Sequence, residues 1–161
     1  MSKEGLDLFK FFLFLHIIAA LFWVGGMLFL TLVIAPFLMT LEPPKRSEIY
    51  QVVGKKFRFW GWVAIVMLLI TGPINLSYLG VTASMLFDPA FHASPYGKAV
   101  MTKIALVILI VLSSLLHDFW LGPGARTNRK YSFYAMLFGR GNLIIALLIV
   151  IFAVIMRSGG W

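Results

Sequence analysis

Residues 15–38 read LHIIAALFWVGGMLFLTLVIAPFL, and His16 is the one ionisable residue in this run. A bilayer core about 30 Å thick is crossed by a helix of about 20 mostly apolar residues. The run therefore predicts a membrane-spanning helix. It belongs to a longer apolar stretch, roughly residues 8–39, so we expect the helix to tilt or to extend past the membrane, with Pro36 loosening its inner end. This stretch is too long for the apolar core of a cleaved signal peptide, and we expect it to be retained.

Three further apolar stretches follow, at roughly residues 57–79, 96–121 and 141–157. The 161 residues are 61% hydrophobic and 12% charged, which lies far from the balance of a soluble globular domain. We predict an all-α protein, an integral membrane four-helix bundle that forms one domain over residues 1–161. Its expected location is the inner (plasma) membrane, as a multi-pass protein, and its soluble parts are too small for a separate catalytic domain.

Basic residues predict the orientation of the chain, because cytoplasmic loops are enriched in Lys and Arg. Residues 40–56 and the segment before residue 141 are expected to be cytoplasmic loops, while residues 80–95 and both termini are expected to be extracytoplasmic. The formal net charge of +8 is mostly this topology signal. The lipid bilayer is the expected partner, and nucleic acid is not, because the basic residues are divided among short loops. The residues that set the orientation are Lys45, Arg46, Lys55, Lys56, Arg58, Arg126, Arg129, Lys130 and Arg140.

Polar residues inside the spans are candidates for function, because a polar group in hydrocarbon costs several kcal/mol unless it is paired or coordinated. The chain has no cysteine, which excludes thiolate metal ligands and the usual covalent attachment of haem. His16 shares a helix face with Trp23 in the first span. Asn75 follows Met67 and Thr71 at helical spacing in the second. In the third span a rotation of 100° per residue places Tyr96, Lys103, Ser114 and His117 in one stripe.

The depths of these residues separate two candidate sites. His16 and Lys103 are expected roughly 10–12 Å below the outer ends of their helices, whereas His117 is expected about 30 Å down its helix. We predict an outer site on His16 and Lys103, and a separate inner site around His117, Asp118 and Asn142. The other cofactor-binding candidates for the outer site are Asn75, Met101, Met156, Trp23 and Tyr96.

Each candidate has an ordinary structural alternative. His16 can be a hydrogen-bonded histidine packed between helices, and Lys103 can extend its ammonium group to the membrane surface. His117 can be a polar residue at the membrane edge. His92 lies in an outer loop, where we expect a solvated side chain.

Three segments resemble a known family of membrane domains. They are residues 15–38, residues 54–76 (GKKFRFWGWVAIVMLLITGPINL) and residues 94–119 (SPYGKAVMTKIALVILIVLSSLLHDF). They resemble the CopD-type copper-resistance membrane domain. A histidine in the first helix and a lysine in the third is also similar to the HemJ-type protoporphyrinogen oxidases, which are four-helix membrane proteins that bind haem b. The resemblance implies a helical bundle, a candidate homo-oligomer, with His16 and Lys103 at functional positions.

From the residues and the resemblance together we predict a haem-b-binding membrane protein. It would transfer electrons between the bilayer and a quinone or a redox protein, and whether it is an enzyme, a membrane oxidoreductase, stays open. His16 is the leading iron ligand, and the opposite axial position falls to Lys103, Met101, Met156 or to no residue. The candidate metal ligands are therefore His16, Lys103 and His117. A flat apolar ring suits a space between helices, and a cation at its edge would neutralise a propionate.

Two alternatives belong to other functional classes. Soft Met and His ligands suit Cu(I), so His16, Met27, Met67 and Met101 are candidates for a path in CopD-like copper binding or transport across the membrane. A non-catalytic membrane subunit or assembly factor would have neither cofactor nor cargo.

Overall fold

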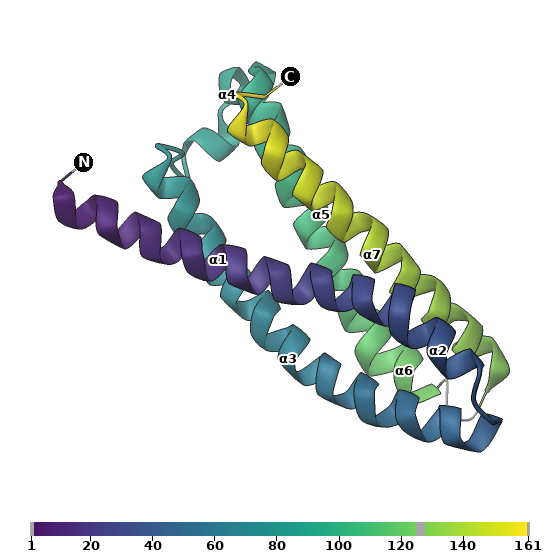
Figure 1. Ribbon diagram of the computed structural model, residues 1–161. Helices are drawn as coiled ribbons and strands as arrows, with labels where there is room; N and C mark the ends of the chain where they lie inside the picture. The colour runs from purple at the N-terminus through teal and green to yellow at the C-terminus, as the bar shows by residue number, and fades with distance from the viewer. Residues whose placement is uncertain (1, 125–127, 161) are drawn as a thin grey trace. The chain divides into compact units, whose positions relative to one another are not determined.

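The computed structural model describes residues 2–124 and 128–160, and all regular structure in these residues is helical (Figure 1). Four helices are long and apolar enough to cross a membrane: Lys3–Met39, Pro43–Tyr78, Pro95–Gly124 and Lys130–Arg157. The prediction of an all-α chain with four membrane spans is thereby confirmed. By its internal contacts the chain divides into two compact units, Met1–Val81 and Thr82–Trp161.

Unit 1 is a helical hairpin in which the first long helix packs along the second. Its elements are α1 (Lys3–Phe29), the π-helical turn η1 (Leu30–Ile34), α2 (Ala35–Met39) and α3 (Pro43–Tyr78). The hydroxyl of Ser2 caps α1 by accepting a hydrogen bond from the Gly5 amide at 3.1 Å. Small residues let the two helices approach, since the indole of Trp23 lies against Gly61 and the ring of Phe57 lies against Gly26.

Unit 2 is a second hairpin, preceded by short elements in residues 80–95, which were expected to form an extracytoplasmic loop. These are the 3₁₀ turn η2 (Met85–Phe87) and α4 (Pro89–Ala93); the hairpin comprises α5 (Pro95–Leu116), the π-helical turn η3 (His117–Leu121), α6 (Gly122–Gly124) and α7 (Arg129–Arg157). Ser94 caps α5, and its hydroxyl accepts from the Gly97 amide at 3.0 Å. A side chain at Gly97 would collide with the Phe91 carbonyl, so glycine permits this tight entry to the helix.

A π-helical turn followed by a proline lies near the end of the first long helix of each unit. The Ala35 amide donates to the Leu30 carbonyl, and the Gly122 amide donates to the His117 carbonyl, both across five residues. Pro36 and Pro123 follow these turns at the same spacing. Proline has no amide hydrogen and its ring crowds the carbonyl four residues earlier, so a widened turn relieves the clash. The expectation that Pro36 loosens this end of the helix is confirmed.

Two expected loops are instead largely helical. α3 begins at Pro43 and not near residue 57, and α7 begins at Arg129 and not near residue 141. Proline is favoured in the first turn of a helix, and the Asn128 side chain accepts from the Lys130 amide at 2.9 Å as a cap. The prediction was wrong because hydropathy marks where a helix enters lipid and not where its hydrogen bonding starts. Arg126, one of the residues used for the orientation, lies outside the described residues, and the orientation itself stays a prediction.

Candidate functional site

His16 is held in unit 1 by a hydrogen bond to the opposite helix. Its Nδ1 lies 2.7 Å from the Thr71 hydroxyl, and that hydroxyl lies 2.7 Å from the Met67 carbonyl oxygen one turn earlier in α3. The side chain of His16 is partly buried, and Thr71 is only 2% exposed. A hydroxyl has one hydrogen to donate and the carbonyl can only accept, so the Thr71 hydroxyl donates to Met67. Which atom donates in the bond between Thr71 and His16 depends on the tautomer of the imidazole.

Asn75 follows Thr71 by one helical turn, and its amide is buried without a hydrogen bond. The residue is 8% exposed, and neither its Nδ2 nor its Oδ1 has a partner among the described residues. A buried amide without a partner costs roughly 1–3 kcal/mol in proteins. Such a group suits a position where a polar ligand or a water completes the hydrogen bonding.

Trp23 has a packing role in unit 1. It is 8% exposed, and its Cδ1 would lie 3.8 Å from a methyl group added at Gly61. Gly72 lies beside His16, because a methyl group added there would be 3.6 Å from the imidazole Cε1. The imidazole therefore rests against the α3 backbone, which limits its movement.

The remaining outer candidates belong to unit 2. Lys103, Met101 and Met156 are partly buried, and the ring of Tyr96 lies 6.4 Å, centroid to centroid, from that of Phe91. Lys103 precedes the first residue of η3 by as many residues as His16 precedes the first residue of η1. The structure joins His16 to Thr71, and a site that combines His16 with Lys103 stays a prediction.

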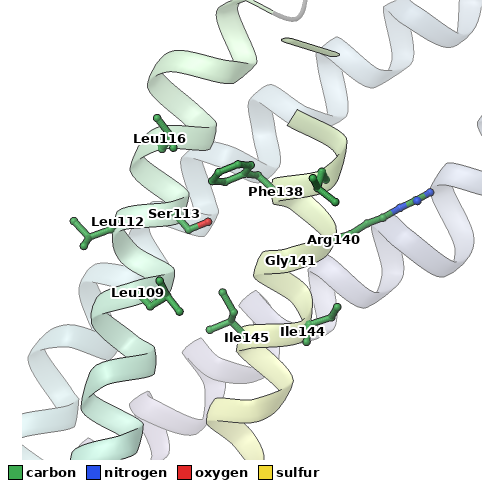
Figure 2. Close-up of a pocket in the computed structure, with 10 residues that line it drawn as sticks. Leu109, Leu112, Ser113, Leu116, Phe138, Arg140, Gly141, Ile144 and Ile145 are labelled. Carbon is green, nitrogen blue, oxygen red and sulfur yellow. The ribbon is translucent and has the colours of Figure 1, made fainter. Parts of the chain in front are cut away.

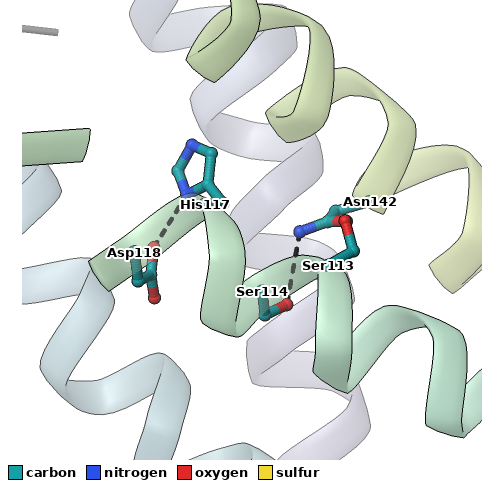
Figure 3. Close-up of polar contacts among 5 residues, drawn as sticks. All are labelled: Ser113, Ser114, His117, Asp118 and Asn142. Atoms are coloured by element: carbon teal, nitrogen blue, oxygen red, sulfur yellow. Dashed lines mark hydrogen bonds and ion pairs between the residues drawn. The ribbon is translucent and has the colours of Figure 1, made fainter. Parts of the chain in front are cut away.

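The inner candidates form two separate hydrogen-bonded groups in unit 2 (Figure 3). His117 Nδ1 lies 2.7 Å from the Asp118 carboxylate, and its Nε2 would be 3.8 Å from a methyl group added at Gly139. Asn142 instead bridges two serines: its Oδ1 accepts from Ser113, and its Nδ2 donates to Ser114 at 3.2 Å. Asn142 is thus engaged in fastening α5 to α7, which is a structural role.

An apolar groove of about 710 Å³ runs between α5 and α7 in unit 2 (Figure 2). Most of its lining residues are aliphatic, and Figure 2 shows the Arg140 side chain extending away from α5. With no cation directed into it, the groove resembles ordinary lipid-facing surface. Its lining includes Leu109, Leu112, Leu116, Phe138, Ile144 and Ile145.

Among the described residues, no group of three or more His, Asp and Glu side chains could hold a metal ion. His16 thus provides a single imidazole in the described part of unit 1. His92 lies in α4 and is exposed, which agrees with the expected solvated side chain, and its Nε2 is 2.8 Å from the Leu86 carbonyl oxygen. Thr71 was not among the predicted site residues. Its position four residues from both Met67 and Asn75 was the available signal, but only the hydrogen bond reveals its relation to His16.

Comparison with known proteins places these features in a family. Residues 51–156 match the copper resistance protein D family, CopD. An uncharacterized protein of Aquifex aeolicus is 40% identical over 151 residues, which cover 93% of this chain and 96% of that protein. The copper transport protein CutJ of Bacillus subtilis is 28% identical over 104 residues, or 65% of this chain and 18% of CutJ. No solved structure matches.

These matches confirm the CopD-type resemblance, whereas the resemblance to HemJ-type oxidases stays a prediction. The chain aligns with nearly the full length of the Aquifex protein but with a small part of CutJ. The family match includes most of α3, all of α5 and most of α7, and the Aquifex protein extends the similarity to most of the chain. The protein is a multi-pass membrane member of the copper resistance protein D family.

Proposed function

We propose that this protein binds copper inside the inner membrane and passes it across the bilayer. The observation that carries the proposal is the imidazole of His16, fixed on a membrane-spanning helix by Thr71 of the opposite helix. Membership of the CopD family and the similarity to CutJ, which is named as a copper transport protein, support copper as the substrate.

The chemistry of the unit 1 residues suits this substrate. A neutral imidazole is a good ligand for copper, and Cu(I) also accepts thioether sulfur, which methionines of the spans can supply. The amide of Asn75 lies one turn from Thr71 and has no partner among the described residues, so it can hydrogen-bond a water or another polar ligand accompanying the ion. The free-energy cost of burying the Asn75 amide would be offset when such a water or polar ligand binds.

The similarity to CutJ favours copper over haem b, which has no comparable support. His16 is the proposed ligand in both cases, so the two hypotheses differ in what the purified protein contains. A colourless protein that binds copper fits the proposal, whereas a Soret band with stoichiometric haem refutes it in favour of electron transfer.

Copper binding can be measured on the detergent-purified protein by anaerobic competition with a chromophoric Cu(I) chelator. We expect wild-type protein to hold the ion and His16→Ala to bind it at least about 10-fold more weakly, because even an indirect contact to a metal ligand changes affinity by about 10–100-fold. His92→Ala is the matched control, since His92 is an exposed histidine of α4. Equal loss in both variants would show that binding is nonspecific.

Transport is tested separately with proteoliposomes that contain a copper indicator. Wild-type protein and His92→Ala should give copper uptake above that of empty liposomes, and His16→Ala should not. Binding without uptake in the wild type would limit the function to copper binding, and the transport part of the proposal would be wrong.

A further inference from the structure

We propose that His117 binds copper through its Nε2, in the space beside Gly139, and that Asp118 is a positioning residue that orients the imidazole for this role. The proposal rests on copper being the substrate of the protein. It concerns unit 2 alone, and it places a second copper-binding histidine in the span Pro95–Gly124, at the η3 end.

Asp118 selects the nitrogen of His117 that is left to bind an ion (Figure 3). The Nδ1 of His117 lies 2.7 Å from the Asp118 carboxylate, and an ionised carboxylate can only accept, so Nδ1 carries a hydrogen. The Nε2 of the same ring makes no hydrogen bond among the described residues. It has a lone pair in the neutral imidazole, and in the imidazolium it releases its proton when a metal binds. A carboxylate on the second nitrogen commonly supports a metal-ligating histidine, because it fixes the ring and makes the ligand more basic.

The space beside Nε2 is open because α7 has a glycine there. A methyl group added at Gly139 would lie 3.8 Å from Nε2. Apart from the backbone of α7 and the two chain neighbours of Gly139, no other described atom lies within 4 Å of that methyl position. The His117 side chain is 32% exposed, so water can complete the coordination of an ion held by one imidazole. Such a site suits transport, since an ion in transit must be bound firmly enough to enter and weakly enough to leave.

The backbone does not require a histidine and an aspartate at this place. Both π-helical turns are closed by a hydrogen bond across five residues, and both are followed by a proline. The first two residues of η3 are His117 and Asp118, whereas those of η1 are Leu30 and Thr31. The same turn thus forms without an ionisable pair. Ionisable groups are rare in membrane spans and π-helical turns are frequent at functional sites, so the pair at η3 points to a role beyond the fold.

The test uses the full chain in a His16→Ala and His92→Gln background, which leaves His117 as the only histidine of the sequence. Detergent-purified protein labelled with ¹⁵N-histidine is titrated with Cu(I) under anaerobic conditions. NMR follows the two ring nitrogens, and competition with a chromophoric chelator gives the affinity. We expect Nδ1 to carry a hydrogen before Cu(I) is added and the Nε2 signal to shift on addition. Adding His117→Gln to this background should abolish the binding measured by competition.

Two further variants in the same background test the support and the space. Asp118→Asn keeps the shape of the side chain but removes its charge, and it should bind Cu(I) about 10–100-fold more weakly, with the hydrogen no longer confined to Nδ1. Gly139→Ala should also bind more weakly, because its methyl group fills the space beside Nε2. It should still fold, since 3.8 Å is an ordinary van der Waals distance. Gly141→Ala is the matched control, because a methyl group there meets no atom within 4 Å.

An Nε2 signal that Cu(I) leaves unchanged overturns the inference, and so does binding that survives His117→Gln. Equal affinity in Gly139→Ala and Gly141→Ala would contradict the position of the ion, and an unchanged affinity in Asp118→Asn would contradict the role of the carboxylate. Failure of the proposed role of His16 is distinguishable. If the His117 background binds Cu(I) but His16→Ala alone binds as well as the wild type, the inference is supported and the role of His16 is refuted.

The reverse result is equally clear. If the wild type binds copper through His16 and the His117 background binds none, the proposed function stands and the inference is wrong.

Discussion

Gly25 and Gly26 are neighbours in α1, and the structure predicts opposite results when each is changed to alanine. A methyl group at Gly26 would overlap ring carbons of Phe57 in α3, whereas a methyl group at Gly25 would meet no atom within 4 Å. Gly26→Ala therefore tests the close approach of α1 and α3 directly, and Gly25→Ala is its matched control.

The magnitude follows from two opposing effects. Alanine is favoured over glycine in a helix by about 1 kcal/mol, and this gain applies equally at both positions. Inserting a methylene into a packed contact costs typically about 1–3 kcal/mol. The Phe57 ring is restrained because it stacks on Phe22 with centroids 6.2 Å apart and an angle of 29° between the planes. We expect Gly26→Ala to be less stable than Gly25→Ala by roughly 1–3 kcal/mol.

Equilibrium unfolding in mixed micelles, with an increasing fraction of a denaturing detergent and tryptophan fluorescence as the probe, measures the difference. Adding Phe57→Ala to Gly26→Ala should remove the clash, so the double variant should lose less than the sum of the two single changes. Equal stability of Gly25→Ala and Gly26→Ala would refute the packing of α1 on α3 described above.

Two further changes test unit 2. Asn142→Ala removes both hydrogen bonds to the α5 serines and should lower the stability of the hairpin by about 1–2 kcal/mol in the same unfolding assay. Hydrogen bonds between membrane helices average about 0.6 kcal/mol each, and the cavity left by the side chain adds to the loss. An unchanged unfolding midpoint would contradict this role of Asn142. Lys103→Met should insert into the membrane at least as well as the wild type, because a lysine at a helix centre costs about 2.5–3.5 kcal/mol. We expect this variant nevertheless to show lower copper uptake. Uptake at the wild-type rate would mean that Lys103 only extends its ammonium group to the surface.

His16 shows how far sequence reasoning reaches. Its place in an uncharged run of 24 residues at positions 15–38 was enough to predict a membrane helix and to make the histidine a candidate ligand. The family also followed from sequence motifs, and residues 51–156 confirm it. The sequence favours haem b because a flat apolar ring suits a space between helices and a cation would neutralise a propionate. The imidazole of His16 suits copper equally, and the similarity to CutJ supports that alternative.

The sequence by itself determined the four apolar helices, because the length and polarity of a span are set locally by the thickness of the bilayer. It also identified His16 as an unusual group in lipid. Only the tertiary structure decided that Thr71 hydrogen-bonds His16, that Asn142 bonds two serines, and that the Asn75 amide has no partner among the described residues. These facts depend on which faces of two helices meet, and residues 55 positions apart in the chain are brought together by packing that no local pattern encodes.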